Sequence, residues 1–150
     1  MAGTSKFSHH VDHDLHRLVT TWQGMILFED VVAHYEERDA IGATVYDQLS
    51  DLRDARVSIN TAQVERLATG ILRKAKTYRL GRVAIVVSDD VSFGMSRMFS
   101  AMVSPEYTIN VFRSHTEARE WLGWTRSRTP GTTRFKDTRS PAPMRERPYH

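Results

Sequence analysis

The chain has 150 residues, no cysteine and a formal net charge of +3, and this length suits one domain that buries a core without staples. The lack of cysteine excludes disulfides, thiolate metal sites and a thiol nucleophile. No apolar run approaches the roughly 20 residues of a membrane span, and residues 1–14 lack the apolar core of a signal peptide. We therefore expect a cytoplasmic protein without a transmembrane segment.

The positive charge is concentrated near the C-terminal end. Residues 124–150 contain seven Lys and Arg against two Asp and Glu, together with four of the five prolines. Apolar residues are sparse there, so we predict a disordered basic tail over 125–150. Such a tail is attracted weakly to anionic surfaces, but it has few aromatic side chains to stack on bases. We therefore predict no specific nucleic-acid partner.

Residues 1–14 are polar and are predicted to form a flexible segment. An extra strand within residues 3–11 is the alternative, but the residues there give no clear strand pattern. The segment and the residues just after it contain a cluster of groups that can ligate metals: His9, His10, Asp12, His13, Asp14 and His16. Ligands in a mobile segment must be ordered on binding, which lowers the affinity. We therefore predict no metal site.

The first strand and the first helix are predicted between residues 15 and 38. Leu15–Trp22 contains apolar and β-branched residues typical of a strand, which Gly24 is predicted to end. A helix is predicted over 28–38, because apolar residues recur there at helical spacing. Its buried face is expected to comprise Phe28, Val31, Val32 and Tyr35.

The next strand is the least clear, because charged residues interrupt its apolar pattern. We predict it over 48–53. Asn60 or Thr61 is then expected to cap a long helix that reaches Tyr78, with Gly81 as its stop. The buried side of this helix is expected to comprise Val64, Leu67, Ala68, Ile71, Leu72 and Ala75.

The central segment is the clearest part of the chain. Val83–Val87 is continuously apolar, which indicates a strand covered on both faces. Asp89 and Asp90 follow, where acidic side chains favour the start of a helix over 91–104. Gly94 is expected to let another backbone come close. The apolar side of the helix is expected to comprise Met95, Met98, Phe99 and Met102.

One more strand and one more helix complete the pattern. A strand is predicted over 107–113, and Ser114 and Glu117 have the spacing of a capping box for a short helix that Gly123 ends. Strands and helices thus alternate along the chain, which indicates an α/β fold. We place this domain at residues 15–124.

At this point the sequence resembles a known group. The segments GRVAIVVSDDVSFGMSRMF (81–99) and INVFRSHTEAREWLG (109–123) are similar to those of the bacterial STAS-like, SpoIIAA-like proteins, and the resemblance spans about residues 15–123. It implies a layered α/β fold with a mixed four- to five-stranded sheet and about four helices, related to the CRAL-TRIO lipid-binding fold. The better-understood relatives are anti-sigma factor antagonists, which bind a kinase partner and are switched by phosphorylation of a Ser.

The resemblance also places a phosphoacceptor in the turn before the helix at residue 60. Thr61 falls nearest to that position and Ser58 is the other hydroxyl within reach, but the Asp-Ser-Ser-Gly run of the antagonists is absent. A phosphate at a helix N-terminus would be stabilised by the free N–H groups. The commoner role for Asn60 and Thr61 is helix capping.

Asp89 and Asp90 are the strongest candidates for chemistry. They follow a central strand, where open α/β sheets often bind ligands, and paired acids can hold Mg²⁺ or transfer protons. No Lys, His or glycine-rich phosphate loop stands near them in sequence to complete a site. We therefore predict that they cap the helix, and that the protein has no catalytic residue, metal or cofactor.

The helix over 91–104 has two interpretations. Arg97 can pair with an acid at the helix start or with a partner's carboxylate, and the methionines suit either a core or an adaptable surface. The surface predicted to meet a partner or ligand comprises Asp89, Asp90, Phe93, Gly94, Arg97 and Met98.

These observations lead to two functional hypotheses. The first is a non-enzymatic regulatory or protein-interaction module that binds a protein partner and forms a homodimer. The alternative is a small-molecule or lipid-binding domain with an apolar pocket between the 91–104 helix and the sheet. An apolar cavity of several hundred cubic ångströms behind Phe93–Met102 favours the second hypothesis, and a filled core with an exposed Met and Phe patch favours the first.

Overall fold

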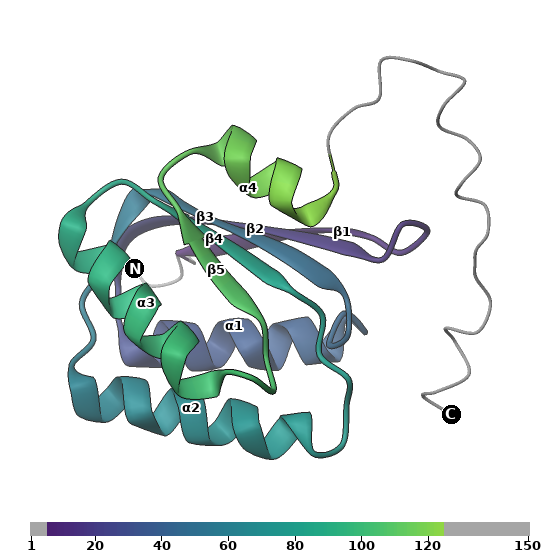
Figure 1. Cartoon of the computed structure of the whole chain (residues 1–150), viewed down its shortest axis with the longest axis horizontal. Helices are drawn as coiled ribbons and strands as arrows, with labels where there is room; N and C mark the ends of the chain where they lie inside the picture. Colours follow the sequence, from purple (N-terminus) through teal and green to yellow (C-terminus); the bar gives the residue numbers. More distant parts are fainter. Residues whose placement is uncertain (1–5, 125–150) are drawn as a thin grey trace.

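Five strands form one sheet in the order β1-β2-β3-β4-β5, so each strand pairs with its neighbours in the chain (Figure 1). β1 runs antiparallel to β2, whereas β2, β3, β4 and β5 are parallel. The strands are β1 (Phe7–Asp12), β2 (Arg17–Ile26), β3 (Asp47–Val57), β4 (Val83–Val87) and β5 (Ile109–Phe112). This computed structural model describes residues 6–124, and it confirms the predicted α/β fold with a mixed sheet.

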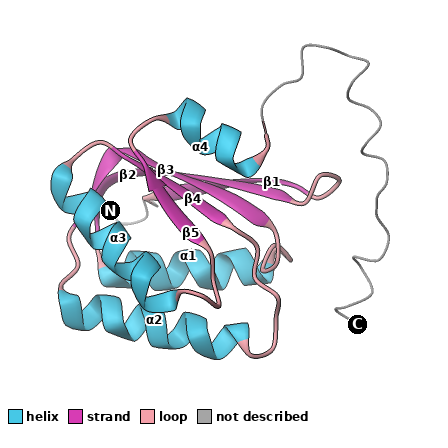
Figure 2. Ribbon diagram, in the orientation of Figure 1, coloured by secondary structure: helices cyan, strands magenta, loops and turns pink. Residues whose placement is uncertain are grey.

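Four helices cover the two faces of the sheet unequally (Figure 2). Three of them lie on one face, and the fourth lies alone on the other. The helices are α1 (Phe28–Ala40), α2 (Thr61–Ala75), α3 (Asp90–Val103) and α4 (His115–Leu122). The helix-rich face is the one that carries the candidate site described below.

β4 is the interior strand that its continuous apolar sequence predicted. Val83 and Ile85 pack into the core beneath α2 and α3, whereas Ala84 and Val86 pack against α4. Because successive strand residues point to opposite faces, only a strand covered on both sides can be apolar at every position.

The N-terminal segment differs from its prediction. Residues 7–12 are not a flexible segment but the edge strand β1, paired with β2 from Phe7 opposite Trp22 to Asp12 opposite Arg17. Phe7 and His9 are half-buried while Ser8 and His10 are exposed. The polar histidines hid this alternation in the sequence.

β2 also extends further than predicted. It continues through Gly24 to Ile26, with a register shift against β3 between Thr21 and Gln23. Gly24 has φ of +83°, a conformation that suits glycine. Gly24 therefore lies within an irregular strand and does not end it.

Two other glycines have roles different from those predicted. α2 ends at Ala75, so Gly81 is not its stop. A Cβ at Gly81 would lie 2.3 Å from the backbone oxygen of Tyr46, whereas a Cβ at Gly94 would meet nothing within 4 Å. The close approach of two backbones predicted at Gly94 therefore occurs at Gly81.

The last helix has the predicted ends. The Ser114 hydroxyl accepts a hydrogen bond from the Glu117 N–H at 3.1 Å, and Gly123 adopts the left-handed conformation. Trp124 is buried against the α4 face of the sheet, with the Arg17 guanidinium 5.0 Å from its ring. The tail predicted over 125–150 lies outside the described residues. Between residues 6 and 124, no helix is long and apolar enough to cross a bilayer.

Candidate functional site

A partly open cavity lies between the sheet and the helices α1, α2 and α3. Its volume is about 90 Å³, taken as the space open to the centre of a water molecule, and its lining comes from β2, α1, β3, α2, β4 and α3. Most lining side chains are aliphatic or aromatic, as at Tyr35, Leu67, Ile85 and Phe99. The cavity is smaller than the roughly 300–1,000 Å³ of pockets for drug-sized ligands. It is large enough for a few water molecules or one compact apolar molecule.

One end of the cavity is polar. The side-chain amide of Gln48 on β3 donates to the Ser50 hydroxyl at 2.9 Å and lies 3.3 Å from the Thr20 hydroxyl of β2. The same amide nitrogen lies 3.2 Å from Nε2 of His34 on α1. These four side chains are all buried. They join α1 to two adjacent strands through hydrogen bonds in an otherwise apolar layer.

His34 is held neutral by its surroundings. Burial lowers the pKa of its imidazole well below the usual value of 6.5, and the neighbouring His9 and Arg38 lower it further. With the Gln48 amide nitrogen facing Nε2, the neutral ring accepts there and carries its proton on Nδ1. Within residues 6–124, Nδ1 of His34 and Nε1 of Trp22 are buried without a hydrogen-bond partner.

Aromatic rings surround His34 on the side of β1 and β2. The centroid of its imidazole lies 5.0 Å from that of His9, 5.2 Å from that of Trp22 and 5.7 Å from that of Phe7. The His9 ring is in turn bonded to the Thr20 hydroxyl at 2.9 Å. β1, which we had predicted to be a flexible segment, thus packs with Phe7 and His9 behind His34 at the polar end of the cavity.

A separate cluster of charged side chains lies at the C-terminal end of α1. The guanidinium of Arg38, only 2% exposed, donates to the Tyr107 hydroxyl at 3.2 Å and to the Asp39 carboxylate at 3.2 Å. Lys74 also pairs with Asp39. Two cations thus share one carboxylate, and Nη2 of Arg38 is buried without a hydrogen-bond partner although it lies 3.2 Å from the Asp39 carboxylate. None of the four residues lines the cavity.

Asp89 and Asp90 do not form a joint acidic site. The Asp89 carboxylate accepts from the Ser92 N–H at 2.9 Å and caps α3, as predicted. Asp90 pairs with Arg113 at 2.7 Å and points into solvent. Partial burial raises the pKa of the Asp89 carboxyl, but hydrogen bonds from Ser92 and Val91 and the positive charge of Arg56 together lower the pKa overall. Each carboxylate therefore has a structural partner of its own.

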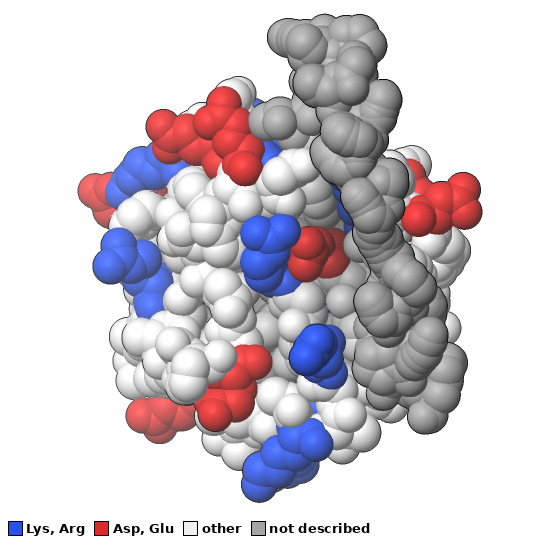
Figure 3. Space-filling model, turned by 45° about the vertical axis from the view of Figure 1, so that its right-hand side comes forward, with Lys and Arg blue, Asp and Glu red and all other residues white. Residues whose placement is uncertain are grey.

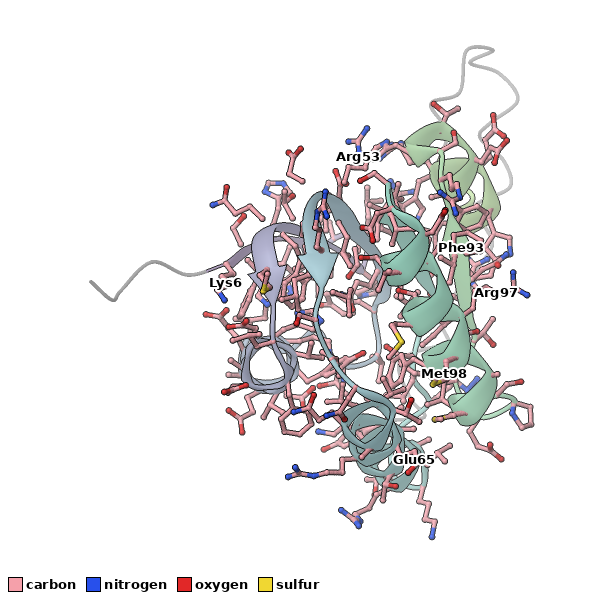
Figure 4. All side chains as sticks on the ribbon, turned by 90° about the vertical axis from the view of Figure 1, so that its left-hand side faces the viewer. Lys6, Arg53, Glu65, Phe93, Arg97 and Met98 are labelled. Atoms are coloured by element: carbon pink, nitrogen blue, oxygen red, sulfur yellow. The ribbon has the colours of Figure 1, made fainter. Side chains whose placement is uncertain are left out.

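The remaining residues of the predicted partner surface lie along α3. Phe93 and Arg97 are on the side of α3 that faces away from α1 (Figure 4). The guanidinium of Arg113 lies 4.5 Å and that of Arg97 5.7 Å from the centroid of the Phe93 ring. Arg97 makes no ion pair with any residue of 6–124, so the ion pair expected with a helix-start acid is formed by Arg113 instead. Gly94 is exposed and Met98 is half-buried.

The two predicted phosphoacceptors are both exposed. Asn60, not Thr61, caps α2: its side chain accepts from the Gln63 N–H at 2.8 Å, and the Gln63 side chain accepts from the Asn60 N–H at 3.0 Å. Thr61 is the first residue of the helix, and Ser58 donates its backbone N–H to the Ile26 oxygen. Phosphorylation of Thr61 or Ser58 stays a prediction.

The N-terminal histidines separate into two places: His13 and His16 both lie against the Tyr46 ring, and His9 lies elsewhere, beside His34. His9 points toward Thr20, whereas His13 is bonded to the Tyr46 hydroxyl at 2.7 Å. Across the described range, no group of three or more His, Cys, Asp or Glu residues is placed to hold a metal ion. On the face seen in Figure 3, acidic and basic side chains are interspersed, and the described part of that face has no continuous basic area.

The sequence analysis did not predict the residues that form the polar end of the cavity. His34 follows Val31 by three residues, so it lies on the face of α1 that was predicted to be buried, and this spacing was a usable signal. Gln48 and Ser50 alternate with the buried Leu49 in β3. Their polar character concealed that both faces of this strand are covered.

Comparisons with known proteins identify the fold. No protein-family model matches the chain, and no curated protein matches it. Four chains of solved structures match. One is an uncharacterized protein of the DUF3478 family with a SpoIIAA-like fold from Shewanella loihica, with 14% sequence identity, 81% of this chain and 98% of that chain covered, and a TM-score of 0.54. The chain therefore has a SpoIIAA-like fold, as the resemblance in its sequence predicted.

Proposed function

We propose that this protein is a binding domain for a compact, largely apolar molecule, which it holds in the cavity between α3, α2, α1 and the sheet. The observation that carries the proposal is the cavity itself. A close-packed interior has few voids larger than a water molecule, and this space of about 90 Å³ is lined mainly by apolar side chains. It lies behind α3, where the alternative sequence-based hypothesis expected a pocket, and it is smaller than the several hundred cubic ångströms expected there.

The surface of α3 gives less support to the hypothesis of a protein-interaction module. Met95, Met98 and Met102 are half-buried and pack against the core, and Phe99 is buried. The large apolar side chain of α3 that is strongly exposed is Val91, at 65%. One such residue is ordinary on a protein surface, whereas an interface core needs a contiguous apolar patch.

The size of the cavity favours a small molecule over a lipid with long acyl chains. The apolar walls supply transfer free energy of about 25 cal/mol per Å² of buried ligand surface. A compact ring with a short substituent would fill the space, whereas an acyl chain would extend beyond it.

The proposal is tested by ligand-dependent thermal stability. Ethylbenzene is expected to raise the Tm of the full chain in a concentration-dependent manner, because a ligand that binds only the folded state stabilises it. Ser96→Leu places a larger side chain in the cavity wall, and should abolish the shift. Ala101→Leu, an exposed substitution on the same helix, is the matched control and should keep it. No shift with the unmodified chain, or equal shifts in both variants, argues against the proposal.

A second candidate function is the protein-interaction module itself, with homodimerisation and a cytoplasmic location as the sequence suggested. Its specific support is Arg97, an exposed guanidinium beside Phe93 without an ion pair inside residues 6–124. Arg97→Glu should weaken binding of an acidic partner or a second copy. Light scattering over a range of protein concentrations, with and without this substitution, tests self-association: a monomer at every concentration would exclude the homodimer.

A further inference from the structure

The polar end of the cavity has hydrogen-bonding capacity that the protein does not use. Ser50 accepts a hydrogen bond from Gln48, which leaves its hydroxyl hydrogen free to donate. The side-chain carbonyl of Gln48 and the hydroxyl of Ser96 make no hydrogen bond with any residue of 6–124. All three residues are buried, and all three line the cavity.

These groups come from different elements but surround one space. Gln48 and Ser50 are two residues apart on β3, so their side chains share the face that the cavity lies on. Ser96 approaches from α3, next to Met95 and one turn before Phe99. An incoming group would therefore meet an acceptor on Gln48 and hydroxyl donors on Ser50 and Ser96.

The cavity offers no charge to balance an ionised ligand. No Lys, Arg, Asp or Glu of residues 6–124 is among the lining side chains. His34 lines the cavity but is held neutral by burial, and Arg38, which donates to Asp39 and Tyr107, does not line the cavity. A carboxylate or an ammonium group moved into this space would lose its hydration without gaining a counter-ion.

We propose that the cavity selects an uncharged alcohol: a compact apolar body with one hydroxyl group, which donates to the Gln48 carbonyl and accepts from Ser50 or Ser96. This inference rests on the proposed function, because it specifies the chemical class of the molecule that the cavity binds. A hydroxyl is a donor and an acceptor at once, so it matches both kinds of group at the polar end. A hydrocarbon leaves them unpaired.

Three probes of nearly equal shape separate the alternatives: ethylbenzene, 2-phenylethanol and phenylacetate, each titrated into the full chain at pH 7.5 and followed by NMR chemical shifts. We expect 2-phenylethanol to bind at least as tightly as ethylbenzene, and phenylacetate to bind at least tenfold more weakly than the alcohol. Phenylacetate binding as tightly as the alcohol overturns the inference. An alcohol that binds tenfold more weakly than ethylbenzene also overturns it.

Two substitutions test whether the preference for the alcohol over the hydrocarbon comes from the polar end of the cavity. Ser50→Ala and Ser96→Ala should each lower the ratio of alcohol affinity to ethylbenzene affinity by about two- to tenfold, the range of a single hydrogen bond. Either variant suffices if the other fails to fold. Equal effects on both probes contradict the inference while the proposed function stands. If none of the three probes binds the unmodified chain, the proposed function fails and the inference fails with it.

Discussion

At the scale of single residues, Gly81 has the tightest surroundings of the glycines in the described part of the chain. A Cβ built there would lie 2.3 Å from the Tyr46 oxygen and 2.8 Å from the Asp47 nitrogen. The Asp47 carboxylate also accepts from the Arg82 N–H at 2.9 Å and pairs with the Arg82 guanidinium. The chain entering β4 is thus pressed against the chain entering β3, and a side chain has no room between them.

Gly81→Ala should lower the free energy of unfolding by about 1–3 kcal/mol, because the backbone must move to relieve the overlap. Gly94→Ala is the matched control: its Cβ has open space in the middle of a helix, so it should raise the free energy of unfolding by about 0.4–1 kcal/mol. Urea denaturation of the two variants measures both values. A loss of stability in Gly94→Ala and none in Gly81→Ala would contradict the close backbone contact at Gly81 and the open space at Gly94.

His34 is a second residue whose surroundings predict a measurable property. Its pKa in the folded protein is well below 6.5 because the imidazole is buried and near His9 and Arg38. In the unfolded chain the imidazole takes up a proton as the pH falls through about 6.5. Between these two values the unfolded state binds more protons than the folded state, so acidification favours unfolding.

The free energy of unfolding should therefore fall as the pH is lowered from 7.5 to 5.5, with up to about 1.4 kcal/mol per pH unit from this histidine. Burial also lowers the pKa of His9 and of His115, which add to the same trend. His34→Gln should make the dependence shallower. Urea denaturation at a series of pH values measures the slope, and parallel slopes for the two proteins would show that His34 is not the buried neutral group described.

At the scale of elements, the start of α3 is fixed by two hydrogen bonds to β3. The Ser92 hydroxyl accepts from the Val57 N–H at the end of β3, and the Ser88 hydroxyl donates to the Arg53 oxygen. Asp89 caps the helix between these contacts. The position of α3 over the cavity therefore depends on its first turn.

Asp89→Ala should destabilise the protein by about 1 kcal/mol, the typical loss for an N-cap residue. Asp89→Asn should cost less, since an amide oxygen still accepts from the Ser92 N–H. Thermal or urea unfolding of the two variants tests this order. An equal loss in both would indicate that the negative charge, and not the cap, is what matters at this position.

Elements with a strong apolar pattern could be predicted, and polar side chains buried within elements could not. β4 and α3 followed from continuous apolar residues and from helical spacing. The buried residues of α1 are His34 and Arg38, because the layer beneath α1 includes Gln48, Thr20 and Tyr107. β1 was not predicted as a strand for the same reason, because its inward side includes the polar residue His9. Patterns in a single sequence predict burial from the spacing of apolar residues. They therefore do not predict the burial of polar side chains that hydrogen-bond to one another.

At the scale of the whole molecule, the arrangement of the helices creates the site. α4 alone covers one face of the sheet, while α1, α2 and α3 share the other (Figure 2). The cavity lies within this shared layer, and its lining extends from Trp22 to Phe99. The alternative hypothesis expected a pocket of several hundred cubic ångströms behind α3, and the cavity there has about 90 Å³. No local pattern could predict its polar end, because Gln48 and Ser50 of β3 line the same space as Ser96 of α3 only once the two elements pack together.

A crystal structure of the full chain under xenon pressure would show whether the cavity exists, because xenon enters apolar cavities that water leaves empty. We expect a xenon atom between α3 and the sheet, in contact with Val64, Ile85 and Phe99. Electron density in which these side chains close on one another, with no xenon between them, would contradict this expectation.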